Sequence, residues 1–158
     1  MNTTASLTVS NDRIDSARRG DDGNGGDRAS APPFSAVGII WLKLAVVYLI
    51  IGVGMGIMMG ASRDFTMRPV HAHVNLLGWA TMALAGLIYS VFPAAGQSKL
   101  ARLHFWLANL SLPVMAVALG MVVTGTAALV PVLAASEIVA ALGILVFAAN
   151  LFLNLKAR

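Results

Sequence analysis

Residues 36–60 read AVGIIWLKLAVVYLIIGVGMGIMMG, and Lys43 is the one charged side chain in this run. A helix needs about 20 consecutive, mostly apolar residues to cross the hydrocarbon core of a bilayer. The segment meets that length, and Lys43 lies close enough to its start to extend its ammonium group to the membrane surface. We therefore expect residues 36–60 to form a transmembrane helix.

Three further apolar segments follow at similar intervals along the chain. Their approximate bounds are 69–92, 101–125 and 131–154. Polar residues, glycine and proline separate the segments, and Pro69 is suited to the first turn of a helix. The sequence predicts one all-α domain, an integral membrane four-helix bundle over residues 34–158.

The composition of the chain indicates a surface that faces lipid. Hydrophobic residues make up 58% of the sequence and charged residues 11%, whereas an ordinary soluble domain has about 25% charged residues. After residue 34 the only carboxylates are Asp64 and Glu137. The net charge of +4 is not gathered in a basic stripe, so we expect membrane lipid and no nucleic acid as a partner. The absence of cysteine excludes iron–sulfur clusters and thiolate-bound metals.

Residues 1–33 differ in composition from the rest of the chain. They are rich in Gly, Ser, Asp and Arg and contain no apolar run, so they cannot bury enough surface to offset the entropy of ordering. We expect a disordered tail. With four spans, the basic residues that share the side of the termini include Arg28, Lys43, Lys99, Arg102, Lys156 and Arg158. Because only Arg63 and Arg68 lie on the other side, the positive-inside rule predicts cytoplasmic termini, with a bacterial inner membrane as the expected location.

Two histidines near the start of the second span, His71 and His73, are the main candidates for chemistry. Ligand-type residues inside a span are costly and suggest function. Residues at positions i and i+2 of a helix point about 200° apart, so this pair cannot clamp one small metal ion. Each imidazole can instead provide one axial ligand to a heme iron on its own side of the helix. The alternative is that both are interfacial residues near a helix start.

The third histidine, His104, begins the third span, which runs in the opposite direction. It therefore lies about 20–25 Å in depth from the first pair and cannot share a heme with them in one chain. We expect an interfacial residue of an aromatic belt, together with Phe105 and Trp106. A role as a metal ligand is the less favoured alternative.

Glu137 lies about two turns into the fourth span, near the predicted depth of His71 and His73. It can form a hydrogen bond with an axial imidazole, move protons, or form a structural ion pair with Arg63 or Arg68. Those arginines are also candidates to bind heme propionates, which favour cationic, bidentate partners. The sequence leaves these roles open.

Gly52, Gly56 and Gly60 are spaced four residues apart in the first span. Small residues at this spacing let helices approach each other closely in lipid. We expect them to form a packing face, either within one subunit or between subunits.

The second and third spans resemble helices ten and eleven of subunit I of the heme-copper oxidases, in particular the cbb-type cytochrome c oxidases. The resemblance rests on three motifs in this order: His71-Ala72-His73, Phe92-Pro93, and Leu103-His104-Phe105-Trp106-Leu107. It implies that the first histidine ligates a high-spin heme, and that the second ligates a low-spin heme on the other side of the helix. It covers about residues 69–107, and elsewhere it extends only to hydropathy.

The chain departs from that family in ways that bear on activity. Subunit I has twelve spans, and the histidines that ligate copper and complete the low-spin heme have no counterpart here. We therefore expect no copper and no complete oxidase in this chain alone, although it can be a component related to cytochrome c oxidase. A four-span chain matches one of the three four-helix arcs of subunit I. A homotrimer would rebuild the twelve-helix disc and hold b-type hemes between His71 of one protomer and His73 of the next.

Two functions remain as alternatives. One is a heme-binding membrane protein for electron transfer, or for binding oxygen or nitric oxide, in a respiratory context. The other is a heme-free accessory or assembly subunit that packs against the subunits of a larger terminal oxidase. A transporter or channel is disfavoured, because the spans lack the internal charges and broken helices typical of substrate pathways.

Overall fold

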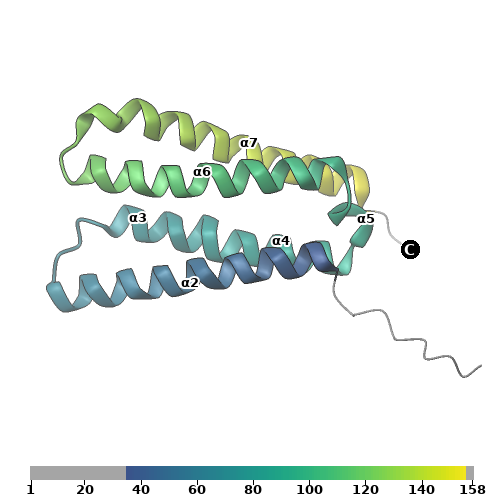
Figure 1. Ribbon diagram of the computed structural model, residues 1–158, viewed down its shortest axis with the longest axis horizontal. Coiled ribbons are helices and arrows are strands. Elements are labelled where there is room, and N and C mark those ends of the chain that lie inside the picture. The colour runs from purple at the N-terminus through teal and green to yellow at the C-terminus, as the bar shows by residue number, and fades with distance from the viewer. Residues whose placement is uncertain (1–34, 156–158) are drawn as a thin grey trace, which may run out of the picture. The chain divides into compact units, whose positions relative to one another are not determined.

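The computed structural model describes residues 35–155, and the predicted disordered tail lies outside them. The described residues fold into helices joined by short connections (Figure 1). In chain order these are α2 (Ala36–Ser62), α3 (Arg68–His73), the π-helix η1 (Val74–Thr81), α4 (Met82–Val91), α5 (Pro93–Gly96), α6 (Lys99–Val123), the 3₁₀-helix η2 (Ala127–Leu129) and α7 (Val130–Asn154).

Four helical segments are long and apolar enough to cross a membrane. They are Ala36–Ser62, Arg68–Val91, Lys99–Val123 and Ala127–Asn154. The spans predicted from the sequence are confirmed, and their ends agree to within four residues. Most of the large apolar side chains on these helices are exposed, among them Ile50, Ile57 and Phe152. Such a surface is stable in lipid and not in water, so the protein is an integral membrane protein.

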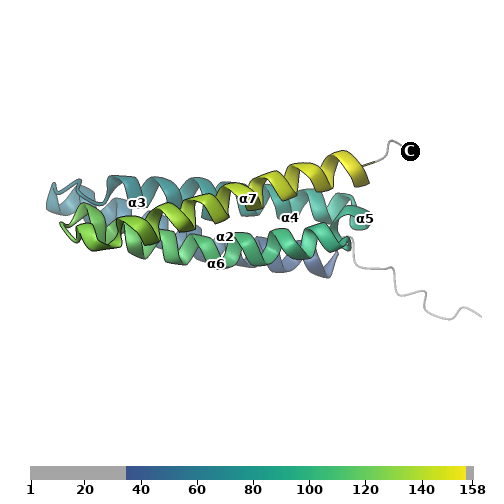
Figure 2. The ribbon, with the colours of Figure 1, turned by 90° about the horizontal axis from the view of Figure 1, so that it is seen from above.

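The helices form two antiparallel hairpins (Figures 1 and 2). In the first hairpin, α2 packs along η1 and α4, and in the second α6 packs along α7. The start of α2, the short helix α5 and the end of α7 lie at one end of the bundle, called here the α5 end. The connection over residues 63–67 and the helix η2 lie at the opposite end, called here the loop end.

Close approach of α2 and α4 depends on Gly38 and Gly86. A Cβ atom at Gly38 would lie 2.7 Å from the carbonyl oxygen of Gly86 and would also overlap the hydroxyl group of Ser90. A Cβ atom at Gly86 would lie 3.0 Å from the carbonyl oxygen of Gly38. The backbones therefore meet where neither residue has a side chain, which is the packing that small residues permit in membranes.

The glycine face predicted for the first span is confirmed in part. A Cβ atom at Gly52 would lie 2.5 Å from the amide atoms of Asn75, and one at Gly56 would lie 3.2 Å from Cε1 of His71. Nothing lies within 4 Å of a Cβ atom at Gly60. Within one protomer, the first two glycines thus receive the second span, while the third faces open space.

The second span is not a uniform α-helix, because η1 forms a π-helix immediately after His73. The hydroxyl group of Thr81 donates a 2.7 Å hydrogen bond to the carbonyl oxygen of Leu76, five residues earlier. In the same segment Gly78 lies against the ring of Tyr48, which a Cβ atom would approach to 2.6 Å. Segments of π-helix are rare and frequently occur at functional sites.

The glycine contact between α2 and α4 can be tested by adding a single methyl group. We expect Gly38→Ala to lower the free energy of unfolding by about 1–3 kcal/mol, because the new Cβ atom meets a backbone carbonyl that cannot move aside. Gly54→Ala in the same helix has nothing within 4 Å and should stay within about 0.5 kcal/mol of the wild type. Unfolding by a denaturing detergent, followed by circular dichroism, measures both. Equal stability of the two variants would contradict the contact.

Candidate functional site

His71 lies half-buried between the second span and α2. Its Nδ1 atom is 3.0 Å from the carbonyl oxygen of Gly52 and 3.3 Å from Nδ2 of Asn75. A carbonyl oxygen can only accept, so the shorter contact requires a proton on Nδ1. The amide group of Asn75 has its own acceptor, the carbonyl oxygen of His71 at 2.8 Å. We therefore assign a proton to Nδ1 of His71, and in the neutral ring the lone pair is then on Nε2.

His73 reaches the same protonation state through its own helix. Its Nδ1 atom lies 2.8 Å from the carbonyl oxygen of Pro69, one turn earlier. This bond also requires a proton on Nδ1, and it too leaves the lone pair on Nε2. The partners of the two imidazoles lie on different elements, since Gly52 belongs to α2 and Pro69 to α3. The two imidazoles are therefore held by different elements.

The loop end carries the two arginines that were predicted to bind propionates. Arg63 and Arg68 are both exposed, and the guanidinium group of Arg68 lies 5.2 Å from the ring centre of Phe65. Arg63 caps α2 with φ 56° and ψ 19°, a left-handed conformation in which glycine is preferred. Between them, the hydroxyl and the backbone N–H of Thr66 donate hydrogen bonds of 2.6 and 2.9 Å to Oδ1 of Asp64. These bonds lower the pKa of that carboxyl group.

Glu137 lies on α7 with its side chain exposed. Helix α7 packs mainly on α6. Among the described residues, the hydrogen-bond partners of His71 and His73 are Gly52, Pro69 and Asn75. Among residues 35–155, Glu137 is therefore not hydrogen-bonded to either imidazole.

His104 does not lie in an aromatic belt at the surface, so that expectation is wrong. Only 2% of its surface is exposed. The imidazole ring is stacked between Trp41 of α2, with ring centres 4.6 Å apart, and Phe147 of α7, at 4.8 Å. Of the other two residues of the expected belt, Trp106 is exposed and Phe105 is half-buried. His104 turns inward because three other helices supply partners for it.

A network of buried polar side chains surrounds His104, and the sequence did not reveal it. The hydroxyl oxygen of Tyr89 lies 3.0 Å from Nδ1 of His104. Nδ2 of Asn150 donates to that hydroxyl oxygen at 3.3 Å and to the carbonyl oxygen of Ala95 at 3.0 Å. Oδ1 of Asn150 accepts from Ser98 at 2.7 Å. The network joins α4, α5, α6 and α7 at the α5 end of the bundle.

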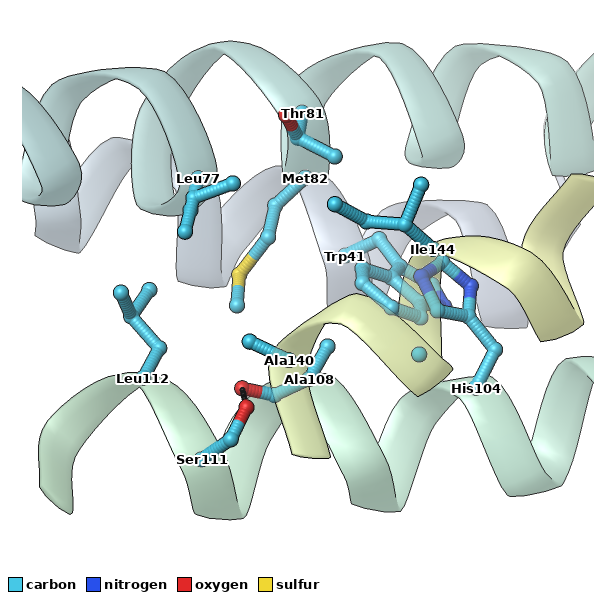
Figure 3. Close-up of a pocket in the computed structure, with 11 residues that line it drawn as sticks. Trp41, Leu77, Thr81, Met82, His104, Ala108, Ser111, Leu112, Ala140 and Ile144 are labelled. Atoms are coloured by element: carbon cyan, nitrogen blue, oxygen red, sulfur yellow. Dashed lines mark hydrogen bonds between the residues drawn. The ribbon is translucent and has the colours of Figure 1, made fainter. Parts of the chain in front are cut away.

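A small cavity of about 30 Å³ lies next to His104 (Figure 3). Its lining is mostly apolar and comes from all four spans, with Met82 and Leu112 among the side chains that enclose it. The polar side chains in the lining are Trp41, Thr81, His104 and Ser111. Nε1 of Trp41 is buried and has no hydrogen-bond partner among residues 35–155.

Side chains that can ligate a metal are scattered over the described residues. In the described part of the chain, no three or more His, Asp or Glu side chains gather into a group that could bind a metal ion directly. Heme requires only one or two protein ligands, because the porphyrin supplies the others. Compared with protein-family models, with curated proteins and with solved structures, the chain matches none of them.

The contribution of the polar network to stability can be measured by substituting two asparagines, one inside the network and one outside it. Asn150→Leu removes partners from Ser98, Asn154, Tyr89 and the carbonyl group of Ala95. We expect a loss of about 1–3 kcal/mol for groups left unpaired. Asn109→Leu removes only one bond within a helix, from Nδ2 to the carbonyl oxygen of Phe105, and should cost about 1 kcal/mol or less. Thermal unfolding in detergent compares the two. A larger loss for Asn109→Leu would show that the network does not join the hairpins.

Proposed function

We propose that the protein is a heme-binding membrane protein related to subunit I of the heme-copper oxidases. It holds b-type heme at the loop end, with His71 and His73 as axial ligands. The membrane is a bacterial inner membrane, with both termini in the cytoplasm and the loop end on the opposite face. Bound heme supplies a one-electron carrier, so we propose electron transfer in a respiratory context as the activity.

The observation that carries this proposal is the contact that Nδ1 of each histidine makes with a backbone carbonyl oxygen. Ligation of iron requires a neutral imidazole with a lone pair on the ligating nitrogen. In metal-binding histidines the other ring nitrogen typically donates to a backbone carbonyl or a carboxylate, which fixes the ring. Nδ1 of His71 lies 3.0 Å from the oxygen of Gly52, and Nδ1 of His73 lies 2.8 Å from that of Pro69. Both residues therefore have the second bond that a heme ligand needs.

The surroundings of His71 also fit a flat macrocycle. A Cβ atom at Gly56 would come within 3.2 Å of Cε1 and 3.9 Å of Nε2 of the imidazole, so glycine at this position leaves the ring room to lie against α2. Arg63 and Arg68 lie exposed at the same end and can pair with propionates. A left-handed conformation costs a non-glycine residue about 1–2 kcal/mol. Arg63 adopts this conformation, which fits a position where the guanidinium group has a function.

The proposed site is shared between two copies of the chain. His71 and His73 point about 200° apart on their helix, so each heme would receive one ligand from each of two neighbouring protomers. Such a contact joins two different faces and closes into a ring, for which we propose a trimer. The carboxylate of Glu137 is exposed in the single chain, which supports the proposal that another copy of the chain covers this face of α7. It lies about 10 Å from the start of α7, where a charge facing lipid would cost about 3 kcal/mol.

Absorbance spectra of the protein purified in detergent and loaded with hemin test this proposal. We expect about one heme per protomer and a low-spin spectrum in both the oxidised and the reduced state. His71→Ala and His73→Ala should each abolish the low-spin spectrum, because each heme loses one of its two ligands. Gly60→Ala, at the same end with nothing within 4 Å, is the control and should bind heme normally. A low-spin spectrum that survives either histidine substitution would rule out the shared site.

Carbon monoxide distinguishes electron transfer from gas binding. An iron with two histidine ligands has no open position, so the reduced spectrum of the wild type should not shift on titration with carbon monoxide. A variant with one remaining ligand should shift. A shift in the wild type would indicate a five-coordinate iron and a role in binding oxygen or nitric oxide. A protein that stays colourless with hemin would instead support the heme-free accessory subunit.

A further inference from the structure

The direction of the hydrogen bonds around Asn150 is fixed by a backbone group. The carbonyl oxygen of Ala95 can only accept, and it lies 3.0 Å from Nδ2 of Asn150. This nitrogen is therefore the amide group and Oδ1 is the acceptor, which agrees with the bond of 2.7 Å from Ser98. The second hydrogen of the amide group is then available for the hydroxyl oxygen of Tyr89, at 3.3 Å.

The orientation of Asn150 determines the tautomer of His104. Because the oxygen of Tyr89 accepts from Asn150, its own proton needs an acceptor, and Nδ1 of His104 at 3.0 Å provides it. A neutral imidazole has one donor nitrogen and one acceptor nitrogen. With Nδ1 accepting, the proton of His104 is on Nε2. Among residues 35–155 this N–H group has no hydrogen-bond partner, since Tyr89 is the one partner of the ring.

A second N–H donor lies beside His104. The indole ring of Trp41 stacks on the imidazole with a centre distance of 4.6 Å and an angle of 27°. Its Nε1 atom is buried and unpaired in the described part of the chain. Both rings line the cavity next to them (Figure 3). A buried N–H group without an acceptor costs about 1–3 kcal/mol, so the indole N–H of Trp41 calls for an acceptor, and the cavity beside it has room for one.

We propose that this cavity is a binding site for an internal water molecule that accepts hydrogen bonds from Nε2 of His104 and Nε1 of Trp41. A volume of about 30 Å³ exceeds the 10–15 Å³ or so that one water needs on this measure. The hydroxyl oxygens of Ser111 and Thr81, which also line the cavity, can accept the hydrogens of the water. The water extends the chain of hydrogen bonds from Ser98 through Asn150, Tyr89 and His104 into the middle of the bundle. This site does not depend on heme.

Nitrogen-15 NMR of the full chain in detergent, labelled at His and Trp, tests the site without any substitution. We expect His104 to be neutral at pH 7 with its proton on Nε2, unlike His71 and His73, whose protons we expect on Nδ1. The Nε1–H signal of Trp41 should show cross-relaxation with a long-lived water. The corresponding signals of Trp106, which faces outward, should show none from a buried water. A proton on Nδ1 of His104, or a dry indole N–H at Trp41, would overturn the proposal.

A pair of buried serines provides matched variants. Ser111 lines the cavity and donates to the carbonyl oxygen of Ala108 in its own helix. Ser136 donates in the same way to that of Leu133 and is not among the residues that line the cavity. Ser111→Val adds volume at the water site, so the cross-relaxation at Trp41 should disappear. It should persist in Ser136→Val, and persistence in both variants would contradict the assigned position of the water.

Discussion

The stacked and hydrogen-bonded imidazole of His104 is the contact on which the arrangement of the two hairpins depends. Lipid is as apolar as the helix surfaces, so burial of apolar groups does not drive helices together in a membrane, and packing and polar contacts do. His104 belongs to the second hairpin but meets Trp41 and Tyr89 of the first hairpin. Phe147 covers its other side. One side chain therefore brings all four spans together near the α5 end.

At the loop end, glycine contacts and a small apolar cluster join the helices. Here the second span rests on glycines of α2, with Asn75 against Gly52 and His71 against Gly56. The π-helix that follows His73 receives Tyr48 at Gly78. Arg63 and Arg68 are exposed at this end, and the imidazoles of His71 and His73 are half-buried. The two ends thus differ because the chain places aromatic residues at one and glycines at the other.

Sequence reasoning predicted the spans because crossing a bilayer requires only length and low polarity, which are local properties. It was wrong about His104, whose direction around the helix is decided by partners far away in the chain. Asn150 was recognisable as a polar residue in a span, yet its bond to Ser98 joins positions 52 residues apart. The π-helix also has no simple signal in the sequence, and Gly78 within it packs on Tyr48, a residue of another helix. The divergence of His71 and His73, by contrast, follows from helix geometry alone.

The same side chain is given opposite chemical roles at the two ends of this bundle. At His71 and His73, Nδ1 meets a backbone carbonyl oxygen, which can only accept, so the lone pair is left on Nε2. At His104, Nδ1 meets a hydroxyl group that must donate, so Nε2 carries the proton instead. A protonated nitrogen cannot ligate a metal, which argues against His104 as an iron ligand unless Tyr89 turns away. The partner of Nδ1 therefore leaves Nε2 as the acceptor in a neutral ring of the first two histidines and as the donor in the third.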